Sequence, residues 1–288
     1  PHPPAVAAAG KCEGFFWAPE LRRSPAAISV KESPLKPLTP DGKVAFLFLT
    51  RGRHHHPDVW QNYWRGETSR ISVYGHASDR SWVVADSTED WLATAQIPTH
   101  YPTAWGDISL VHAELALLKT ALADLRNQFF VFASESCIPV RPLQELLRLL
   151  SIDGRSRFRT EKIAQVHAVN PFKSARASEC GPVPPEDWRF HPQWMLLNRE
   201  AAELIMSNAP LVDLFAGTHA PDESAFGTLL HLAGYPMESR VASQDITWTR
   251  WPSTIAANPE TFFDITPELA GDIAASGCYF ARKFGPGS

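Results

Sequence analysis

The stretch that decides the fold is Lys43-Val-Ala-Phe-Leu-Phe-Leu-Thr-Arg-Gly52, in which an unbroken apolar run ends in a polar turn. A short run of this kind is typical of a strand buried on both faces of a parallel sheet. Further strands are predicted at residues 70–75, 82–85 and 128–133, and apolar residues at helical spacing predict a helix over 107–125. The alternation predicts an α/β fold with a central, mostly parallel twisted sheet flanked by helices.

Three of these strands end in polar residues. The polar residues are Thr50-Arg51, Gly75-His76 and Ser134-Glu135-Ser136, and each group lies at or just after the carboxyl end of its strand. Ligands of parallel α/β sheets usually bind beyond the carboxyl ends of the strands. We therefore expect a binding site at this edge of the sheet.

The second half of the chain is less regular. Pro142 is expected to open a helix, and residues 153–193, rich in Pro, Arg, Ser and Gly, are predicted to form a long loop. A short strand is predicted at 194–197 and a last strand at 278–284. Helices are predicted at 199–208, 221–232 and 266–277, the last with Thr266 as N-cap and Gly277 at its end.

Composition excludes several classes of protein. The 288 residues are 44% hydrophobic and carry a net charge of -4, so a packed core is expected, and a pI near 6.3 argues against a nucleic-acid binder. No apolar run reaches the roughly 18 residues that span a bilayer.

Eight of the 25 prolines fall within residues 1–42, which are predicted to be a stem or tail before a domain at 43–288. Ten tryptophans are enough to supply stacking platforms, for sugar rings among other ligands.

Metal and disulfide chemistry have weak support in the sequence. The cysteines at Cys12, Cys137, Cys180 and Cys278 form no C-x-x-C pair, so a zinc site is not expected, while disulfides stay open. Three consecutive histidines, His54 to His56, point to alternating faces if the segment is extended, which favours a solvated loop over a shared metal ion. Cys137 is either a nucleophile or, more commonly for such a position, a small buried residue.

The acidic pair Asp222-Glu223 follows Pro221 at the start of a predicted helix. Acids in a first helical turn are favoured by the helix dipole, which explains the pair without any function. A carboxylate at such a position in a cleft also suits a general base. The spacing alone leaves both interpretations open.

No Asp in the chain belongs to an Asp-x-Asp motif. Enzymes that hold a sugar-nucleotide diphosphate through a divalent metal normally need such paired acids. If this chain binds a sugar nucleotide, basic side chains must neutralise the diphosphate instead. The candidates are Arg282-Lys283 on the last predicted strand, with Arg250 or Arg240.

Several segments together resemble the core-2/I-branching glycosyltransferase family, a β-1,6-N-acetylglucosaminyltransferase-like family (glycosyltransferase family 14), and specifically its plant and algal branch. They occur in family order from residue 43 to 284. The similar segments are Val44-Ala-Phe-Leu-Phe-Leu-Thr-Arg-Gly52, Trp105-Gly-Asp-Ile-Ser-Leu-Val-His-Ala-Glu114, Phe130-Val-Phe-Ala-Ser-Glu-Ser-Cys-Ile-Pro139, Trp188, Gln193-Trp194 with Asn198-Arg-Glu200, Pro221-Asp-Glu223, Thr247-Trp-Thr-Arg-Trp251 and Phe280-Ala-Arg-Lys-Phe284.

The resemblance implies a GT-A-like fold and an inverting, metal-independent transfer from a UDP-sugar to a glycan or glycoprotein hydroxyl, with no cofactor. Glu223 matches the family's catalytic base. The resemblance places Lys283 at the diphosphate, with Arg282 or Arg250 beside it, and the nucleotide near Thr50, Arg51, His76 and Trp105. It places the acceptor near Trp251, Asp222 and Glu135. N-acetylglucosamine is the first candidate for the sugar, followed by xylose and glucuronic acid.

The resemblance also implies a location and shows one departure. Family members work in the Golgi or the secretory-pathway lumen as type II membrane proteins, so membrane attachment is expected only through a segment outside these residues. Animal members have a second basic diphosphate contact before the lysine, where this chain has Asn258 or a neighbour. That departure keeps open a non-catalytic carbohydrate-binding protein, and a metal-dependent enzyme using the histidine triplet is the third alternative.

Overall fold

The predicted strand at residue 43 lies at the centre of the molecule. The computed structural model describes residues 34–83, 90–176, 183–253 and 258–287. In it, β1 (Lys43–Thr50) pairs in parallel with β2 (Ile71–Ala77) on one side and β3 (Asn127–Ala133) on the other. Every residue of β1 after Lys43 is buried, as expected for a strand covered on both faces.

The main sheet of the described residues has the strand order β2-β1-β3-β8-β5-β9. Its other strands are β8 (Leu196–Asn198), β5 (Ser156–Arg157) and β9 (Val241–Ala242). Only β8 runs against the others, because it is antiparallel to both of its neighbours, β3 and β5. The predicted α/β fold with a mostly parallel central sheet is confirmed.

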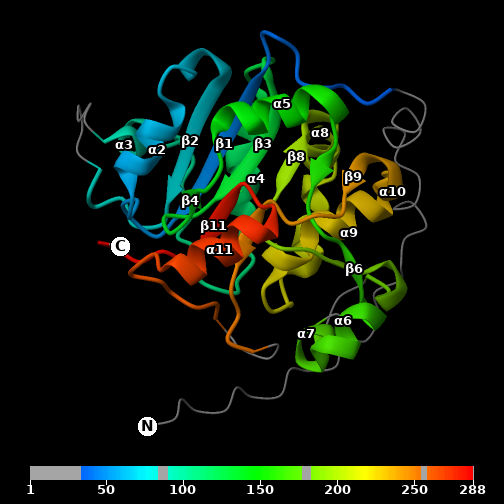
Figure 1. The fold of residues 1–288 in the computed structure, drawn as a ribbon. Coiled ribbons are helices and arrows are strands. Elements are labelled where there is room, and N and C mark those ends of the chain that lie inside the picture. The colour runs from blue at the N-terminus through cyan, green and yellow to red at the C-terminus, as the bar shows by residue number, and fades with distance from the viewer. Residues whose placement is uncertain (1–33, 84–89, 177–182, 254–257, 288) are drawn as a thin grey trace.

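Helices cover both faces of this sheet (Figure 1). Ala45, Leu47 and Leu49 pack with α4 (Ser109–Leu122), α8 (Arg199–Ser207) and α9 (Ala225–Leu232). The alternate residues of the strand, Val44, Phe46 and Phe48, pack with α2 (Pro57–Trp64) and α5 (Leu143–Asp153). The alternation of side chains along β1 thus divides the core into two layers.

A smaller sheet lies beside the carboxyl ends of the central strands. It has the order β10-β11-β4, with β10 (Thr247–Thr249), β11 (Phe280–Arg282) and β4 (Ile138–Pro139). The helix α11 (Pro267–Ser276) packs on it through Leu269 and Ile273. As predicted, Thr266 caps this helix and Gly277, with φ of 72°, ends it. The last strand, predicted over residues 278–284, spans only residues 280–282, and beyond it Phe284 forms an isolated bridge with Phe262.

The segment predicted as a long loop, residues 153–193, is folded where the structure describes it, so that prediction was wrong. It contains β5, a hairpin of β6 (Glu161–Lys162) with β7 (Arg189–Phe190), and the helices α6 (Ile163–Val169) and α7 (Pro171–Ala175). The reason is local capping. Gln165 accepts from the backbone N–H of Lys162, and Asn170 accepts from that of Lys173, with Pro171 at the first helical position.

Two further predictions need correction. Trp82 and Val83 form a turn rather than a strand, because the Asp79 side chain accepts from the N–H of Ser81 and the Asp79 carbonyl from the Trp82 indole; residues 84 and 85 lie outside the described residues. The helix predicted from Pro221 begins as a separate 3-10 turn, η5 (Pro221–Glu223), and α9 starts only after Ser224.

The remaining described elements connect these layers. They are η2 (Thr68–Arg70), α3 (Trp91–Thr94), η3 (Pro185–Asp187), η4 (Ala209–Phe215) and α10 (Met237–Arg240). Residues 34–42 of the predicted stem are described, and Leu38 is buried and donates to the Leu150 carbonyl. Within the described residues no helix is long and apolar enough to cross a membrane.

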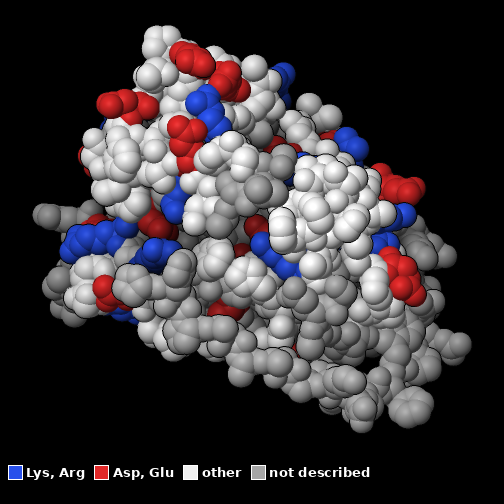
Figure 2. Space-filling view, turned by 90° about the horizontal axis from the view of Figure 1, so that it is seen from below, with Lys and Arg blue, Asp and Glu red and all other residues white. Residues whose placement is uncertain are grey.

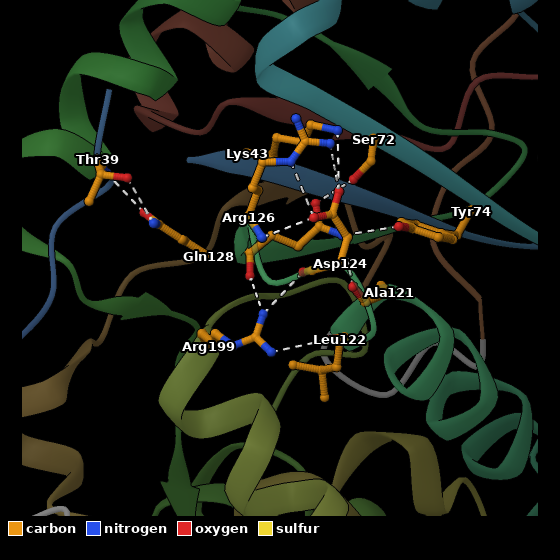
Figure 3. A network of polar contacts seen from close by, with 11 residues as sticks. Thr39, Lys43, Ser72, Tyr74, Ala121, Leu122, Asp124, Arg126, Gln128 and Arg199 are labelled. Carbon is orange, nitrogen blue, oxygen red and sulfur yellow. Dashed lines mark hydrogen bonds and ion pairs between the residues drawn. The ribbon is translucent and has the colours of Figure 1, made fainter. Parts of the chain in front are cut away.

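A polar network ties the amino ends of β1 and β3 together (Figure 3). Lys43 pairs with Asp124 at 3.2 Å, and Asp124 also binds Arg126. The guanidinium of Arg199 donates to the carbonyls of Leu122, Asp124 and Asn127 at 2.9–3.2 Å. Arg199 therefore satisfies carbonyls at and beyond the end of α4, where a cation is also favoured by the helix dipole.

Candidate active site

A large cavity opens at the carboxyl ends of the central strands. Its volume is about 1270 Å³, and its wall includes Thr50 and Arg51 after β1 and Ser134 and Glu135 after β3. Figure 2 views the molecule from this side and shows Lys, Arg, Asp and Glu side chains recessed between uncharged ones. The cavity is large enough for a nucleotide-linked sugar together with part of a second ligand. A cavity is therefore present at the edge of the sheet where a binding site is expected.

Glu223 lies in the cavity wall on η5 and binds two cations. Its Oε2 is 2.8 Å from Nη1 of Arg176 and 3.1 Å from Nζ of Lys173. Burial by itself raises the pKa of the Glu223 carboxyl, but the charges and hydrogen bonds of the two cations outweigh burial and hold the pKa below its usual value. Glu223 is therefore ionised at neutral pH.

The backbone before η5 is strained. Ala220 adopts the left-handed conformation, with φ of 51°, and its N–H donates to the Gly106 carbonyl at 2.9 Å. For a residue with a Cβ this conformation costs about 1–2 kcal/mol. The Glu223 carbonyl accepts from the N–H of His191 at 2.8 Å. These contacts hold the turn, and with it Asp222 and Glu223, against the wall of the cavity.

Asp222 differs from its neighbour in having no cation. Its side chain lines the cavity, yet the residue is only 7% exposed, and its Oδ1 is buried without a hydrogen-bond partner among the described residues. Burial, and then the charge of Glu223, raise the pKa of Asp222 to about 7. A second carboxyl, Glu114 of α4, is fully buried and accepts from Nε2 of Gln193 at 3.0 Å. Burial, and then Asp222, raise the pKa of Glu114 well above its usual range.

A cluster of three cations lines another part of the cavity. Arg51, Arg282 and Lys283 all belong to its wall. Burial, followed by the charges of Arg282 and Arg51, lowers the pKa of Lys283, which shows that the three cations lie close enough to repel one another. The guanidinium carbon of Arg282 lies 4.8 Å from the Trp194 ring centroid, and its Nε is buried with no partner in the described part of the chain. Such a cluster suits a ligand with more than one negative charge.

Glu135 lies beside this cluster. Its Oε2 accepts from the backbone N–H of Arg51 at 3.4 Å, and its charge opposes the lowering of the pKa of Lys283. Thr50 lines the same wall and donates to the Gly52 carbonyl at 2.9 Å, which fixes the turn after β1.

Exposed aromatic rings surround the mouth. Trp105 is 59% exposed and meets His219 edge-on, with ring centroids 5.1 Å apart, and Trp251 is 46% exposed. Phe172, on α7, is another exposed ring of the cavity wall. Flat, accessible rings of this kind suit the apolar faces of sugars.

Two predicted site residues lie away from the cavity wall. His76 is buried beneath it, and its Nε2 accepts from the Tyr101 N–H at 2.9 Å; burial and then Arg80 lower the pKa of His76 to about 4, so it is neutral. Arg250 forms an ion pair with Asp272 on α11 and stacks on Trp248 and Phe262. His76 lies opposite Leu49 in the sheet and Arg250 follows Thr249, the partner of Arg282, but neither His76 nor Arg250 belongs to the cavity wall. Arg240, the other candidate, is buried in an ion pair with Glu200.

Three residues of the candidate site were not predicted from the sequence: Lys173, Arg176 and Glu114. The two cations fall in the segment taken for a loop, where Asn170-Pro171 is a helix-start signal that would have indicated α7. Glu114 falls on the buried face of α4 between Val111 and Leu115. An acid on an apolar helical face is the signal that could have singled it out.

No group of three or more His, Cys, Asp or Glu among the described residues could hold a metal ion. The histidine triplet is less solvated than expected, because His54 packs against Phe48 and Trp91 at ring-centroid distances of 5.5 Å. Burial, and then His56 and His55, lower the pKa of His54 to about 3. Cys137 is buried, as expected, and it and Cys278 are free thiols, while Cys12 and Cys180 lie outside the described residues.

The family profile described as Core-2/I-Branching enzyme matches residues 44–274, most of the chain. The chain belongs to this family. Glycosyltransferase BC10 of Oryza sativa subsp. japonica is 28% identical to it over 290 residues, which cover 86% of this chain and 69% of the rice protein. The family and this relative identify the branching-family chain as a glycosyltransferase.

Among solved structures, the apo structure of the bifunctional glycosyltransferase WbbM matches 86% of the chain with a TM-score of 0.37 and 9% identity. The match covers 47% of that protein, so the chain spans about half the length of this structural relative.

Proposed function

We propose that this branching-family protein transfers a sugar from a UDP-sugar to a hydroxyl of a glycan or glycoprotein, with inversion at the anomeric carbon. One observation carries the proposal: an ionised carboxylate, Glu223, and a cluster of cations, Arg51, Arg282 and Lys283, line the same cavity. Glu223 also acts electrostatically on Arg282, which indicates that the two groups are close. A base for the acceptor and positive charge for a leaving diphosphate are the two groups that this reaction needs.

The proposed step is a direct displacement. The acceptor oxygen attacks the anomeric carbon from the face opposite UDP, its proton goes to Glu223, and UDP leaves with the electron pair of the broken bond. Lys283 and Arg282 neutralise the charge that grows on the diphosphate, with Arg51 beside them. In this scheme positive side chains supply the charge that a metal ion supplies in Asp-x-Asp enzymes, so we propose that no metal takes part.

The remaining predicted residues divide between the two ligands. We propose that Thr50, Arg51 and Trp105 lie along the nucleotide, with His76 supporting the loop that ends at Tyr101 rather than touching the ligand. Trp251, Glu135 and Asp222 would lie along the acceptor. N-acetylglucosamine is the first donor sugar to test, followed by xylose and glucuronic acid. We place the enzyme in the lumen of the Golgi or secretory pathway, anchored through a segment outside the described residues.

A thermal-shift screen of UDP-sugars tests the donor, because a ligand that binds only the folded protein raises the apparent unfolding temperature. The UDP-sugar that gives the largest shift is then offered with glycan acceptors, and NMR of the product reads the anomeric configuration. Inversion of the donor's α-configuration to a β-linkage is expected. Retention would contradict the proposal.

A non-catalytic carbohydrate-binding protein is the second candidate. It is favoured by Asn258, an uncharged residue in the cavity wall at the place where animal relatives are expected to have a second cation. Calorimetry with UDP separates the two candidates together with a transfer assay. Binding of UDP together with sugar transfer supports the enzyme. Binding of a sugar with neither UDP binding nor transfer supports the carbohydrate-binding protein.

A further inference from the structure

Three carboxyl groups meet at η5, but only one of them has cations bound to it. Both Nζ of Lys173 and Nη1 of Arg176 lie on Oε2 of Glu223, at 3.1 and 2.8 Å. The neighbouring Asp222 and the carboxyl of Glu114 on α4, which packs against η5, have no ion pair among the described residues. Two buried acids therefore have no directly bound cation in the described part of the chain.

Asp222 also has an unused oxygen. The residue is 7% exposed, lines the cavity, and its Oδ1 has no hydrogen-bond partner in the described part of the chain. A buried carboxylate without a partner costs several kcal/mol, and such a group takes up a proton instead. A protonated carboxyl can donate a hydrogen bond, which a carboxylate cannot do.

We propose that Glu114 and Asp222 form a carboxyl pair that keeps a proton at neutral pH, and that Asp222 uses it to donate a hydrogen bond to a hydroxyl oxygen of the acceptor sugar. The inference rests on the proposed function, since it takes the cavity to bind an acceptor beside Glu223. The two adjacent residues then have different tasks: Glu223, ionised, receives the proton of the attacking hydroxyl, and Asp222, neutral, holds a neighbouring hydroxyl. Glu114 acts through Asp222 and is a positioning residue.

The surrounding charges agree with this division. Burial, and then Glu223, raise the pKa of Asp222, while Arg176 and Lys173 of α7 oppose that rise without cancelling it. Burial and then Asp222 raise the pKa of Glu114, which Gln193 opposes by its hydrogen bond. Glu223, held by its two cations, has its pKa lowered. When their surroundings give two adjacent acids different pKa values, one can be ionised and act as a base while the other stays protonated and donates a hydrogen bond.

Matched amide substitutions at the two neighbours test the assignment. Asp222→Ala removes the donor and is expected to raise the acceptor KM by about 2- to 13-fold, whereas Asp222→Asn keeps a neutral donor and is expected to recover most of that loss at pH 6.5. Glu223→Gln removes a base and is expected to cost roughly 100- to 10,000-fold. The pH profile gives a second readout: the loss of activity as pH rises through about 7 should disappear in Asp222→Asn. A loss in Asp222→Asn as large as that in Glu223→Gln would overturn the proposal.

Thermal unfolding tests the proton without any substrate. An acid whose pKa is raised in the folded state favours folding less as pH rises from its unfolded pKa to its folded pKa. The unfolding temperature of Asp222→Asn relative to the unmodified protein should therefore increase between pH 5 and pH 8. Glu223→Gln should instead be less stable than the unmodified protein at pH 8, because Glu223 is stabilised as the anion. The same difference for Asp222→Asn at both pH values would contradict the proton-holding pair.

Glu114→Gln keeps the test decisive if Asp222→Asn does not fold. Its unfolding temperature relative to the unmodified protein should also increase with pH, since it removes the other acid of the pair, and a constant difference contradicts the pair. These measurements separate the inference from the proposed function. If the unmodified protein transfers no sugar from any UDP-sugar, the proposed function fails, while the pH dependence of unfolding still decides whether the pair holds a proton.

Discussion

Glu223 and Lys283 lie sixty residues apart in the sequence and meet the same cavity with opposite charges. The neighbours of each group change its ionisation. The cations of α7 and its C-cap lower the pKa of Glu223, while burial, followed by the charges of Arg282 and Arg51, lowers the pKa of Lys283. In the proposed function, a diphosphate bound at this cluster would relieve the repulsion among the three cations. Binding of UDP should therefore depend on each of them.

Reversing the charge of Lys283 is expected to weaken UDP binding by about 10- to 150-fold, because a charge-assisted hydrogen bond is worth about 1.5–3 kcal/mol. Calorimetry with UDP on Lys283→Glu measures the loss. Arg250→Glu is the matched control, since Arg250 pairs with Asp272 outside the cavity wall, and its UDP affinity should not change. Unchanged affinity in Lys283→Glu, or an equal loss in Arg250→Glu, would contradict this placement of the diphosphate.

At the scale of elements, α7 is the helix that most directly sets the chemistry. It is only five residues long, but it carries Lys173, and Arg176 is its C-cap. It also carries Phe172, whose ring is exposed in the cavity wall. The element that lowers the pKa of Glu223 thus also presents an exposed ring in the cavity where we propose that the acceptor binds.

Removing a cation of α7 should change the pH dependence of transfer. In Lys173→Met the pKa of Glu223 rises, since one of the two charges that lower it is gone. The base is then protonated at a higher pH, and the acid limb of the kcat profile moves to higher pH. A kcat profile measured between pH 4 and 8 shows the shift. Lys162→Met on the neighbouring β6 is the control, and a shift of equal size there would sink the idea.

The elements that could be predicted are those with strong local signals. The apolar run of β1, the helical spacing of α4 and the capping signals of α11 all have their expected structure. Residues 153–193 could not be predicted in the same way, because their elements are two to seven residues long where described and owe their place to pairing with distant segments, as β5 does with β8 and β9.

The residues of the candidate site likewise include some that could be predicted from the sequence and some that could not. Topology predicted the strand ends at Thr50 and Glu135, and residue type together with the family resemblance predicted Glu223 and Lys283. All four line the cavity. Lys173 and Glu114 were missed because their contacts with η5 are tertiary. Arg250 follows Thr249, which pairs with Arg282 in the small sheet, but its side chain pairs with Asp272 and does not belong to the cavity wall.

At the scale of the whole molecule, the polar network around Arg199 and the cavity lie at opposite ends of the central strands. The network of Figure 3 holds the amino ends, where Arg199 binds three backbone carbonyls, and the cavity lies at the carboxyl ends (Figure 2). Mutations in the network should therefore change the free energy of unfolding without changing catalysis.

Arg199→Ala is expected to lower the free energy of unfolding by about 2–3 kcal/mol, since it leaves carbonyls without a charged donor. Denaturant unfolding measures the loss, and kcat/KM of the folded variant should stay within about twofold, as expected for a site remote from the substrate. Arg148→Ala, on the exposed side of α5, is the control for a lost surface charge. A large fall in kcat/KM with stability intact would show that the two ends are coupled.

Asp124 in the same network gives a pH dependence. Hydrogen bonds from Arg126 lower the pKa of Asp124 to about 2, a shift that burial opposes and Lys43 assists. Because the folded pKa lies below the unfolded one, the stability this acid contributes is present above about pH 4 and is lost as pH falls toward 2. In Asp124→Asn, the deficit in unfolding temperature should shrink between pH 5 and pH 2.5. A deficit that does not change with pH would contradict this role.

The central claim is that one cavity pairs a carboxylate base with a cationic diphosphate site. The most direct test measures, on Glu223→Gln, both the transfer rate from the preferred UDP-sugar and the affinity for UDP. The account predicts a transfer rate reduced roughly 100- to 10,000-fold with UDP affinity unchanged. Transfer within tenfold of the unmodified enzyme, with UDP bound normally, would contradict it.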